Sequence, residues 1–108
     1  MAVTHVPFAT MDWAPSPTHP LEHKKVAPGR SLALLRFEPG FADPNLCLRS
    51  HVLYVLQGVL DLQLEDRVER VAAGEACWLD RGSAHRAVNP GSEPAVVLIV
   101  SDVSAEPA

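Results

Sequence analysis

Apolar and polar residues alternate along much of this chain with the two-residue period of β-strands. The clearest example has Leu60, Leu62 and Leu64 at every second position, separated by Asp61 and Gln63. Successive side chains of a strand point to opposite faces, so this pattern predicts a strand with one face against a core and the other in water.

Turn residues divide the chain into short segments of this kind. Pro39-Gly40 is typical, because a helix cannot continue through that pair. We expect strands over residues 22–27, 31–38, 51–57, 59–65, 67–72, 76–79, 85–88 and 95–100, and a loop or irregular strand over 41–50. Short strands with turns at this spacing predict an all-β sandwich or barrel, with no helix longer than about two turns.

The two ends of the chain are expected to lie outside this barrel. Residues 1–30 are interpreted as an N-terminal segment that packs on the barrel through Phe8 and Trp13, with an extended loop over 14–20. The barrel itself is expected to span 31–102, and residues 103–108, which are small and polar, form a tail that frays.

Composition excludes several classes of protein. A chain of 108 residues that is 47% hydrophobic forms a single domain with a core. A net charge of −4 gives no reason to expect a nucleic acid or a membrane surface as partner. No apolar run is long enough to span a bilayer, and no secretion signal precedes the first strand, so the expected location is cytoplasmic.

The location bears on the state of the two cysteines, Cys47 and Cys77. Thiols stay reduced in the cytoplasm, so two free thiols are expected, with a Cys47–Cys77 disulfide as the alternative.

Three phrases of the chain resemble the sequence motifs of the cupin family. Residues 74–89 have the spacing of the second cupin motif, which holds proline where this chain has Asp80 and places a histidine at the position of His85. Residues 37–40 and 52–58 resemble the turn before the first motif and the second half of that motif. The resemblance implies a small single-domain cupin of the conserved-barrel type, a double-stranded β-helix or jelly-roll barrel, with His85 pointing inside.

The resemblance also implies a set of candidate metal ligands. The first cupin motif normally offers two histidines and a glutamate, and counting back from Gly58 puts Asn45, Cys47 and His51 at those three positions. Cys47, His51 and His85 are therefore the candidate ligands, with Asn45 as an additional one. A thiolate and two imidazoles suit a divalent transition metal of the zinc or iron class and are poor ligands for magnesium or calcium.

Structural roles for the same residues remain open. Each histidine can be a hydrogen-bonded residue of the barrel mouth, and Cys47 can pack as a small apolar side chain. If His51 faces inward, Leu53 and Val55 do so too, because side chains of a strand alternate. No acidic side chain is expected inside, so that acid–base chemistry would fall to His51 or His85.

Three kinds of function fit these residues. The first is a metal-assisted oxygenase, isomerase or lyase that acts on a small organic molecule held in the barrel. The second is a metal-free, non-catalytic module that binds or senses a small ligand, and the third is a structural partner in a larger assembly. Whether the chain is an enzyme stays open at this point, since no catalytic triad, phosphate loop or dinucleotide motif is present.

A homodimer is also expected. Val52, Tyr54 and Leu56 form an apolar stripe on the outer face of their strand, and small cupins are often dimers. The N-terminal segment could cover the same stripe within one chain.

Overall fold

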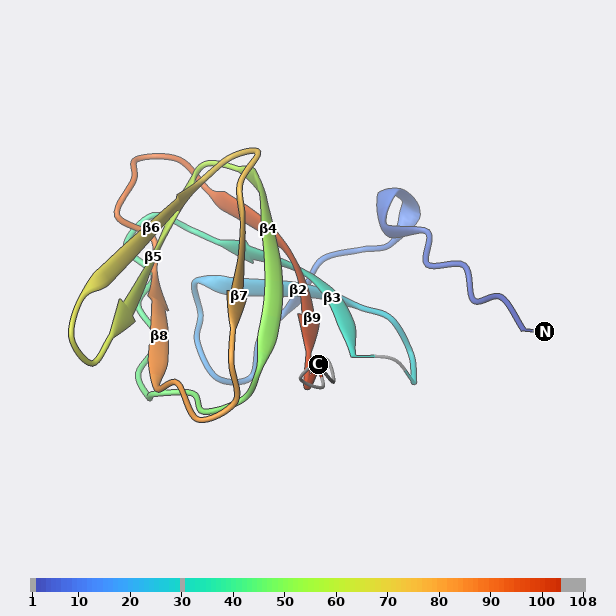
Figure 1. Cartoon of the computed structure of the whole chain (residues 1–108). Helices are drawn as coiled ribbons and strands as arrows, with labels where there is room; N and C mark the ends of the chain where they lie inside the picture. The colour runs from blue at the N-terminus through green and yellow to red at the C-terminus, as the bar shows by residue number, and fades with distance from the viewer. Residues whose placement is uncertain (1, 30, 104–108) are drawn as a thin grey trace.

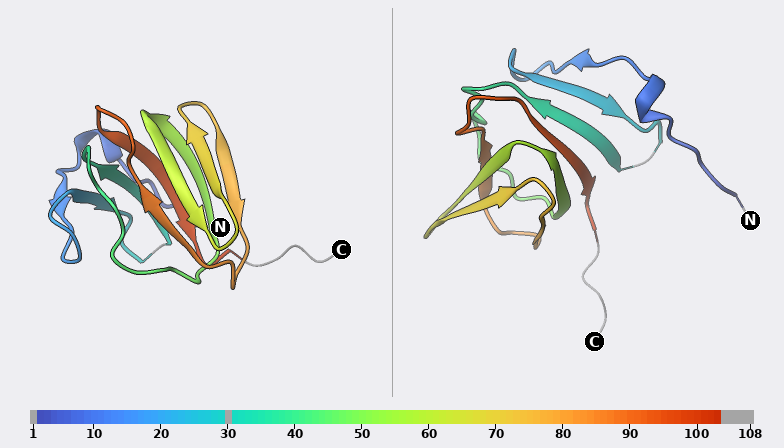
Figure 2. Two further views of the ribbon diagram at one scale, coloured as in Figure 1. Left: turned by 90° about the vertical axis from the view of Figure 1, so that its left-hand side faces the viewer. Right: turned by 90° about the horizontal axis from the view of Figure 1, so that it is seen from above.

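Two antiparallel β-sheets face each other in the computed structural model of the chain, which describes residues 2–29 and 31–103 (Figure 1). The larger sheet has the strand order β1-β2-β3-β9-β4-β7, and the smaller one the order β6-β5-β8. The strands are β1 (Ala14–Pro15), β2 (Glu22–Val26), β3 (Leu32–Phe37), β4 (His51–Gln57), β5 (Val59–Leu64), β6 (Val68–Ala72), β7 (Ala76–Leu79), β8 (His85–Val88) and β9 (Ala95–Ser101). Figure 2 shows the two sheets curving around a common interior. The predicted all-β jelly-roll barrel is confirmed.

The strands agree closely with those expected from the sequence. Strands β4, β7 and β8 have the predicted bounds, and the other predicted strands differ by one residue at one or both ends. The expected loop over 14–20 differs, since its first two residues form β1 and pair with β2. The described residues contain one short 3-10 helix, Phe8–Thr10, and no helix among them is long and apolar enough to cross a bilayer.

The core lies between the inner faces of the two sheets. Along β4, Leu53 and Val55 are buried together with His51, whereas Tyr54 and Leu56 are exposed, as the alternation predicted. The largest fully buried side chains come from both sheets and from the segment after β3: Phe41, Leu60, Leu62, Val55 and Val97.

Asn89 fixes the end of β8. Its side-chain nitrogen donates to the carbonyl oxygens of Phe37, at 2.9 Å, and Glu93, at 3.0 Å, and its Oδ1 accepts from the N–H of Gly91. The buried amide therefore joins the last residue of β3 to the turn after β8. This explains why an asparagine stands where the second motif ends.

The N-terminal segment packs on β2 rather than on the middle of the large sheet. The Nζ atom of Lys25 donates to the carbonyl oxygen of Phe8 at 2.7 Å and lies 4.7 Å from the centre of the Trp13 ring. Phe8 and Trp13 thus hold this segment through one buried lysine. At the other end of the chain, Ser50 Oγ donates to the carbonyl oxygen of Val103, and the rest of the expected tail lies outside the described residues.

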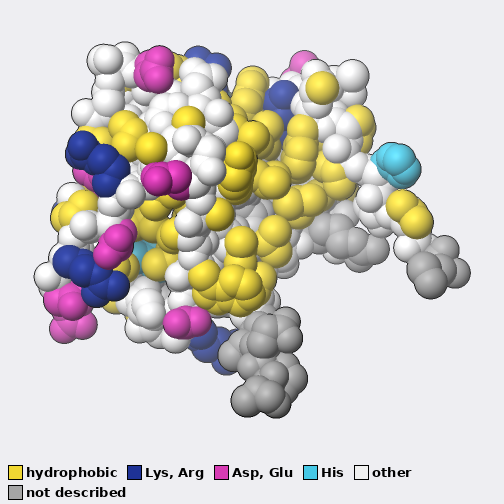
Figure 3. Space-filling model, turned by 45° about the horizontal axis from the view of Figure 1, so that its top comes forward, with side chains coloured by type: hydrophobic (Ala, Val, Ile, Leu, Met, Phe, Trp, Pro, Cys, Tyr) yellow, Lys and Arg dark blue, Asp and Glu magenta, His cyan; other side chains and the backbone are white. Residues whose placement is uncertain are grey.

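An apolar face is left on the outside of the large sheet. The register of β4 with β7 and β9 places eight apolar residues together on it: Val52, Tyr54, Leu56, Ala76, Trp78, Val96, Leu98 and Val100. Tyr54 is 41% exposed, Leu56 51% and Trp78 53%. Figure 3 shows apolar side chains gathered between the barrel and the N-terminal segment. Monomeric proteins rarely expose an apolar area of this kind.

We propose that a second copy of the chain covers this face. The face carries no charged side chain along β4, β7 and β9, so two copies can meet through it about a two-fold axis without burying a charge. Light scattering should give a mass near twice 11.7 kDa at micromolar concentration. Leu56→Lys should weaken association at least about tenfold, because it places a charge in a desolvated interface.

Val68→Lys is the matched control, since Val68 is equally exposed but lies on β6 of the small sheet. A wild-type mass near that of one chain would refute the dimer.

Gly58 offers a test of the turn between β4 and β5. Its φ of +77° favours glycine, and a Cβ there would lie 2.6 Å from the carbonyl oxygen of Pro94. Gly74 has a φ of +88°, and no atom lies within 4 Å of the position that a Cβ would take. Gly74→Ala therefore measures the backbone strain without a clash. We expect Gly58→Ala to lower the free energy of unfolding by about 2 kcal/mol or more, and Gly74→Ala by about 1 kcal/mol. Urea denaturation of both variants measures this difference. Equal losses of unfolding free energy in the two variants would contradict a clash with the Pro94 carbonyl oxygen.

Candidate functional site

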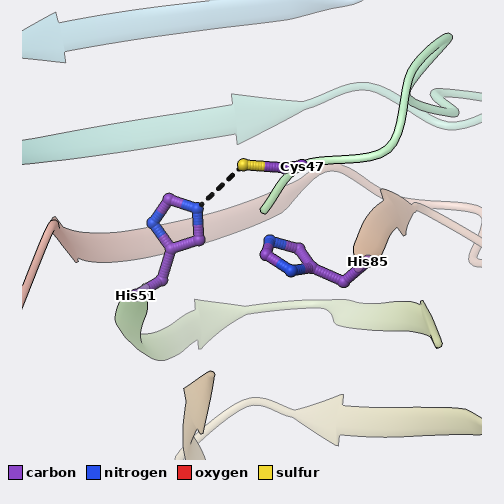
Figure 4. A group of neighbouring side chains, drawn as sticks. All are labelled: Cys47, His51 and His85. Carbon is purple, nitrogen blue, oxygen red and sulfur yellow. Dashed lines mark hydrogen bonds between the residues drawn. The ribbon is translucent and has the colours of Figure 1, made fainter. Parts of the chain in front are cut away.

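Cys47, His51 and His85 meet inside the barrel. Their ligand atoms all lie within 4.8 Å of one another, and the two imidazole rings are 5.2 Å apart at an angle of 82°. Figure 4 shows the three side chains converging from three different parts of the chain. His51 and His85 are buried and Cys47 is partly buried. The structure therefore brings together the three residues that the sequence singled out.

Backbone hydrogen bonds place Cys47 beside His85. The N–H of Cys47 donates to the carbonyl oxygen of His85 at 2.7 Å, and the N–H of His85 donates back to Cys47 at 3.1 Å. Residues 41–50 do not form a regular strand, and they join β8 through two isolated bridges and the hydrogen bonds of Asp43 with Ala87. The side chains from residue 45 to 51 therefore do not alternate as they would in a regular strand. The backbone pairing of Cys47 with His85 places its thiol beside His51 instead.

Both imidazole rings are held by their Nδ1 atoms. His51 Nδ1 lies 3.0 Å from Ser101 Oγ, and His85 Nδ1 donates to the carbonyl oxygen of Ser83 at 2.7 Å. A carbonyl oxygen only accepts, so His85 carries a proton on Nδ1, and its Nε2 holds the lone pair when the ring is neutral. Metal-binding histidines are oriented in this way by a partner on the second nitrogen.

Ser101 was not identified from the sequence. It lies at the end of β9, fifty residues after His51, and pairs with it across the sheet. Nothing in a local pattern indicates that pairing, and only the register of β4 with β9 reveals it.

His51 is a neutral imidazole at neutral pH. Burial lowers its pKa to about 4, and the positive charges of His85 and Arg49 act in the same direction. Metal ions bind the neutral ring, so the environment of His51 removes proton competition near pH 7.

The three donors are close enough to one another to hold a divalent transition metal. With bond lengths of roughly 2.3 Å to sulfur and 2.1 Å to nitrogen, a tetrahedral zinc ion spaces these atoms about 3.6 Å apart. Cys47 Sγ lies 3.5 Å from His51 Nε2. A soft thiolate with two imidazoles suits zinc or iron, and three protein ligands leave a position open for a ligand. Asn45 is exposed, lines the same cavity and makes no hydrogen bond to the three among the described residues.

The cluster opens into a cavity of about 570 Å³. This volume suits a small organic molecule. Apolar walls surround the cluster, formed by side chains of both sheets such as Phe37, Leu53 and Leu62. Both cysteine thiols are free, so the alternative of a Cys47–Cys77 disulfide is excluded.

The prediction that no acidic side chain lies inside was wrong. Glu22 and Asp43 both line the cavity, and Glu22 is only 7% exposed. The register of β2 with β3 places Glu22 opposite Phe37 on the inner face. The register of β2 could not be predicted from its residues alone. Asp43 lies in the irregular segment after β3, where no alternation predicts which way a side chain points.

Comparisons with known proteins agree with this architecture. Residues 34–101, more than half of the chain, match the family model of the cupin domain. KdgF from Halomonas sp. superposes with a TM-score of 0.73 at 22% identity, over 95% of this chain and 96% of that chain. The polyketide cyclase RemF from Streptomyces resistomycificus gives 0.73 at 24% identity, over 99% and 82%. A sugar phosphate isomerase of the cupin superfamily from Silicibacter pomeroyi gives 0.72 at 16% identity, over 94% and 76%.

These structural similarities establish the fold alone, since the sequence identity to each of the three proteins is below 25%. A search of curated proteins finds no match to the chain.

Proposed function

The chain belongs to the cupin domain family, and on this premise we propose that it binds a divalent transition metal at Cys47, His51 and His85. With that metal it acts as an isomerase, lyase or oxygenase on a small organic molecule held in the barrel. The observation that carries the proposal is the pair of oriented imidazoles: each ring is anchored through Nδ1, and Cys47 Sγ lies 3.5 Å from Nε2 of His51.

Each residue of the site has a defined task in this proposal. Ser101 and the carbonyl of Ser83 orient the rings, and the burial of His51 keeps its ring neutral. The apolar walls exclude water from a ligand and strengthen its electrostatic interactions with the site. A bound zinc or iron ion would act there as a Lewis acid that polarises an oxygen of the ligand.

The range of activities among similar folds supports a small-molecule enzyme. One of the similar structures is a sugar phosphate isomerase and another a polyketide cyclase. Both descriptions concern reactions of small organic molecules.

A metal-free ligand-binding barrel is the second candidate. It is favoured by the contact between Cys47 Sγ and His51 Nε2, which satisfies both groups without a metal. It is also favoured by the departures from the family motif at Asn45, Cys47 and His51.

Metal analysis separates the two candidates. Protein purified without an affinity tag and dialysed against dilute zinc should retain about one ion per chain by mass spectrometry. His85→Ala should lower this content at least about tenfold, because two donors hold the ion less tightly than three. Ser101→Ala should weaken zinc affinity about 10- to 100-fold, as expected when the partner of a metal-binding histidine is lost.

His5→Ala is the control, since His5 is exposed and does not line the cavity. Unchanged zinc content in His85→Ala would exclude His85 as a ligand. A wild-type protein without stoichiometric metal would favour the metal-free barrel.

A further inference from the structure

Lys24 places a positive charge on the inner wall of the cavity. It pairs with Leu35 of β3, which in turn pairs with Val97 of β9, so Lys24 shares the face of the large sheet that carries these two buried side chains. Lys24 is partly buried and lines the cavity. The next residue, Lys25, lies on the opposite face, because side chains of a strand alternate. The only two lysines of the chain are thus on opposite faces of β2.

Lys24 is a cation of the cavity wall without a partner. In the part of the chain that the structure describes, it forms no hydrogen bond or ion pair. Arg49 also lines the cavity, but both carboxylate oxygens of Asp102 hold it. Glu22, two residues before Lys24 on the same face, accepts a hydrogen bond from Thr18 at 3.3 Å instead. The Lys24 ammonium is therefore left to bind an anionic group of a ligand.

Apolar side chains separate Lys24 from His51. Strands β3 and β9 lie between β2 and β4, and Figure 4 shows the four ribbons in this order from the top of the view. Three strand spacings amount to roughly 14 Å along the curved sheet. Apart from Ser101, which holds His51, the residues of β3 and β9 that line the cavity are apolar: Leu32, Ala33, Leu35, Phe37, Val97 and Ile99. A ligand that reaches from Lys24 to His51 therefore needs an apolar carbon chain.

Glu22 and Asp43 limit the charge of such a ligand. Both line the cavity, and neither forms an ion pair with another described residue. A second negative charge on the ligand would be repelled by these carboxylates, and the repulsion is strong where water is partly excluded. The wall therefore favours a ligand with a single negative charge.

We propose that Lys24 binds the carboxylate of a small monoacid, whose apolar chain lies on β3 and β9 and whose second oxygen lies at Cys47, His51 and His85. The position of the second oxygen rests on the function proposed above, whereas the role of Lys24 does not. The ligand class is a keto or hydroxy acid with the two oxygen groups several carbon atoms apart. A polyhydroxylated chain fits poorly, because the apolar wall would leave its hydroxyl groups without partners.

A first experiment tests Lys24 in the metal-free protein. Carbon-13 labelled lysine gives separate Cε signals for Lys24 and Lys25 in NMR spectra. Valerate, a monoanion with an apolar chain, should shift the Lys24 signal in a saturable way. Lys25 is the internal reference, since it lies on the opposite face and is held by Phe8 and Trp13. Pentanol has a similar chain without a charge and should shift the Lys24 signal much less.

Substitutions of Lys24 separate its charge from its bulk. Lys24→Met keeps an unbranched side chain without the charge, so it should weaken valerate binding about tenfold through the loss of a charged hydrogen bond. Lys24→Arg keeps the charge and should bind valerate within about threefold of the wild type. Arg86→Met is the control, because Arg86 is exposed on the outer face of β8 and donates to Gln63.

Three results would overturn the role of Lys24. Equal valerate affinity of the wild type and Lys24→Met would assign Lys24 to protection of the sheet edge near β2, where an inward charge opposes pairing with other strands. Shifts of the Lys25 signal as large as those of Lys24, or no saturable binding by the wild type, would show that the anion does not reach the inner wall.

A second experiment tests the other end of the ligand with zinc-loaded protein. Levulinate adds a ketone oxygen to the valerate chain, so it should bind at least about tenfold more tightly than valerate when a metal holds that oxygen. Zinc content is measured before the acids are added. Equal binding of the two acids would overturn the metal-bound end of the ligand and count against the proposed function. The metal-free titration with valerate still decides the role of Lys24.

Discussion

The backbone pairing between Cys47 and His85 is the contact on which the site depends. Residues 41–50 connect two strands of the large sheet, β3 and β4, yet this pairing attaches them to β8 of the small sheet. The attachment closes one side of the barrel. It also brings the thiol of Cys47 toward His51, which begins the next strand. Without it, the backbone of Cys47 would not be held beside His85.

The cavity combines groups that a purely structural core would not contain. His51 is kept neutral by burial, and Glu22 and Asp43 line the cavity without an ion pair to any residue of 2–29 and 31–103. Each of these features opposes folding, and the surrounding apolar core of the two sheets must offset it. Destabilising polar groups that converge on one cavity are typical of functional sites, where stability is reduced in favour of chemistry.

The outer and inner faces of β4 show how one strand serves two purposes. His51, Leu53 and Val55 build the cavity wall, while Val52, Tyr54 and Leu56 form the apolar outer face. Lys25 holds the N-terminal segment at β2 and so leaves that outer face free. A second copy seated there would pack directly behind the strand that carries His51, and association would then be coupled to the site through that strand.

The sequence by itself determined the strands and the kinds of residue at the site. Alternation and turn residues predicted β4, β7 and β8 with their bounds, because strand facing depends only on neighbours two residues apart. The resemblance to the cupin motifs, and not the alternation, identified Cys47, His51 and His85. Only the tertiary structure decided which distant residues join them: Ser101 through the register of β9, Glu22 through that of β2, and Asp43 through the irregular segment. Register between strands far apart in the chain is set by packing of the whole barrel, and no local pattern encodes it.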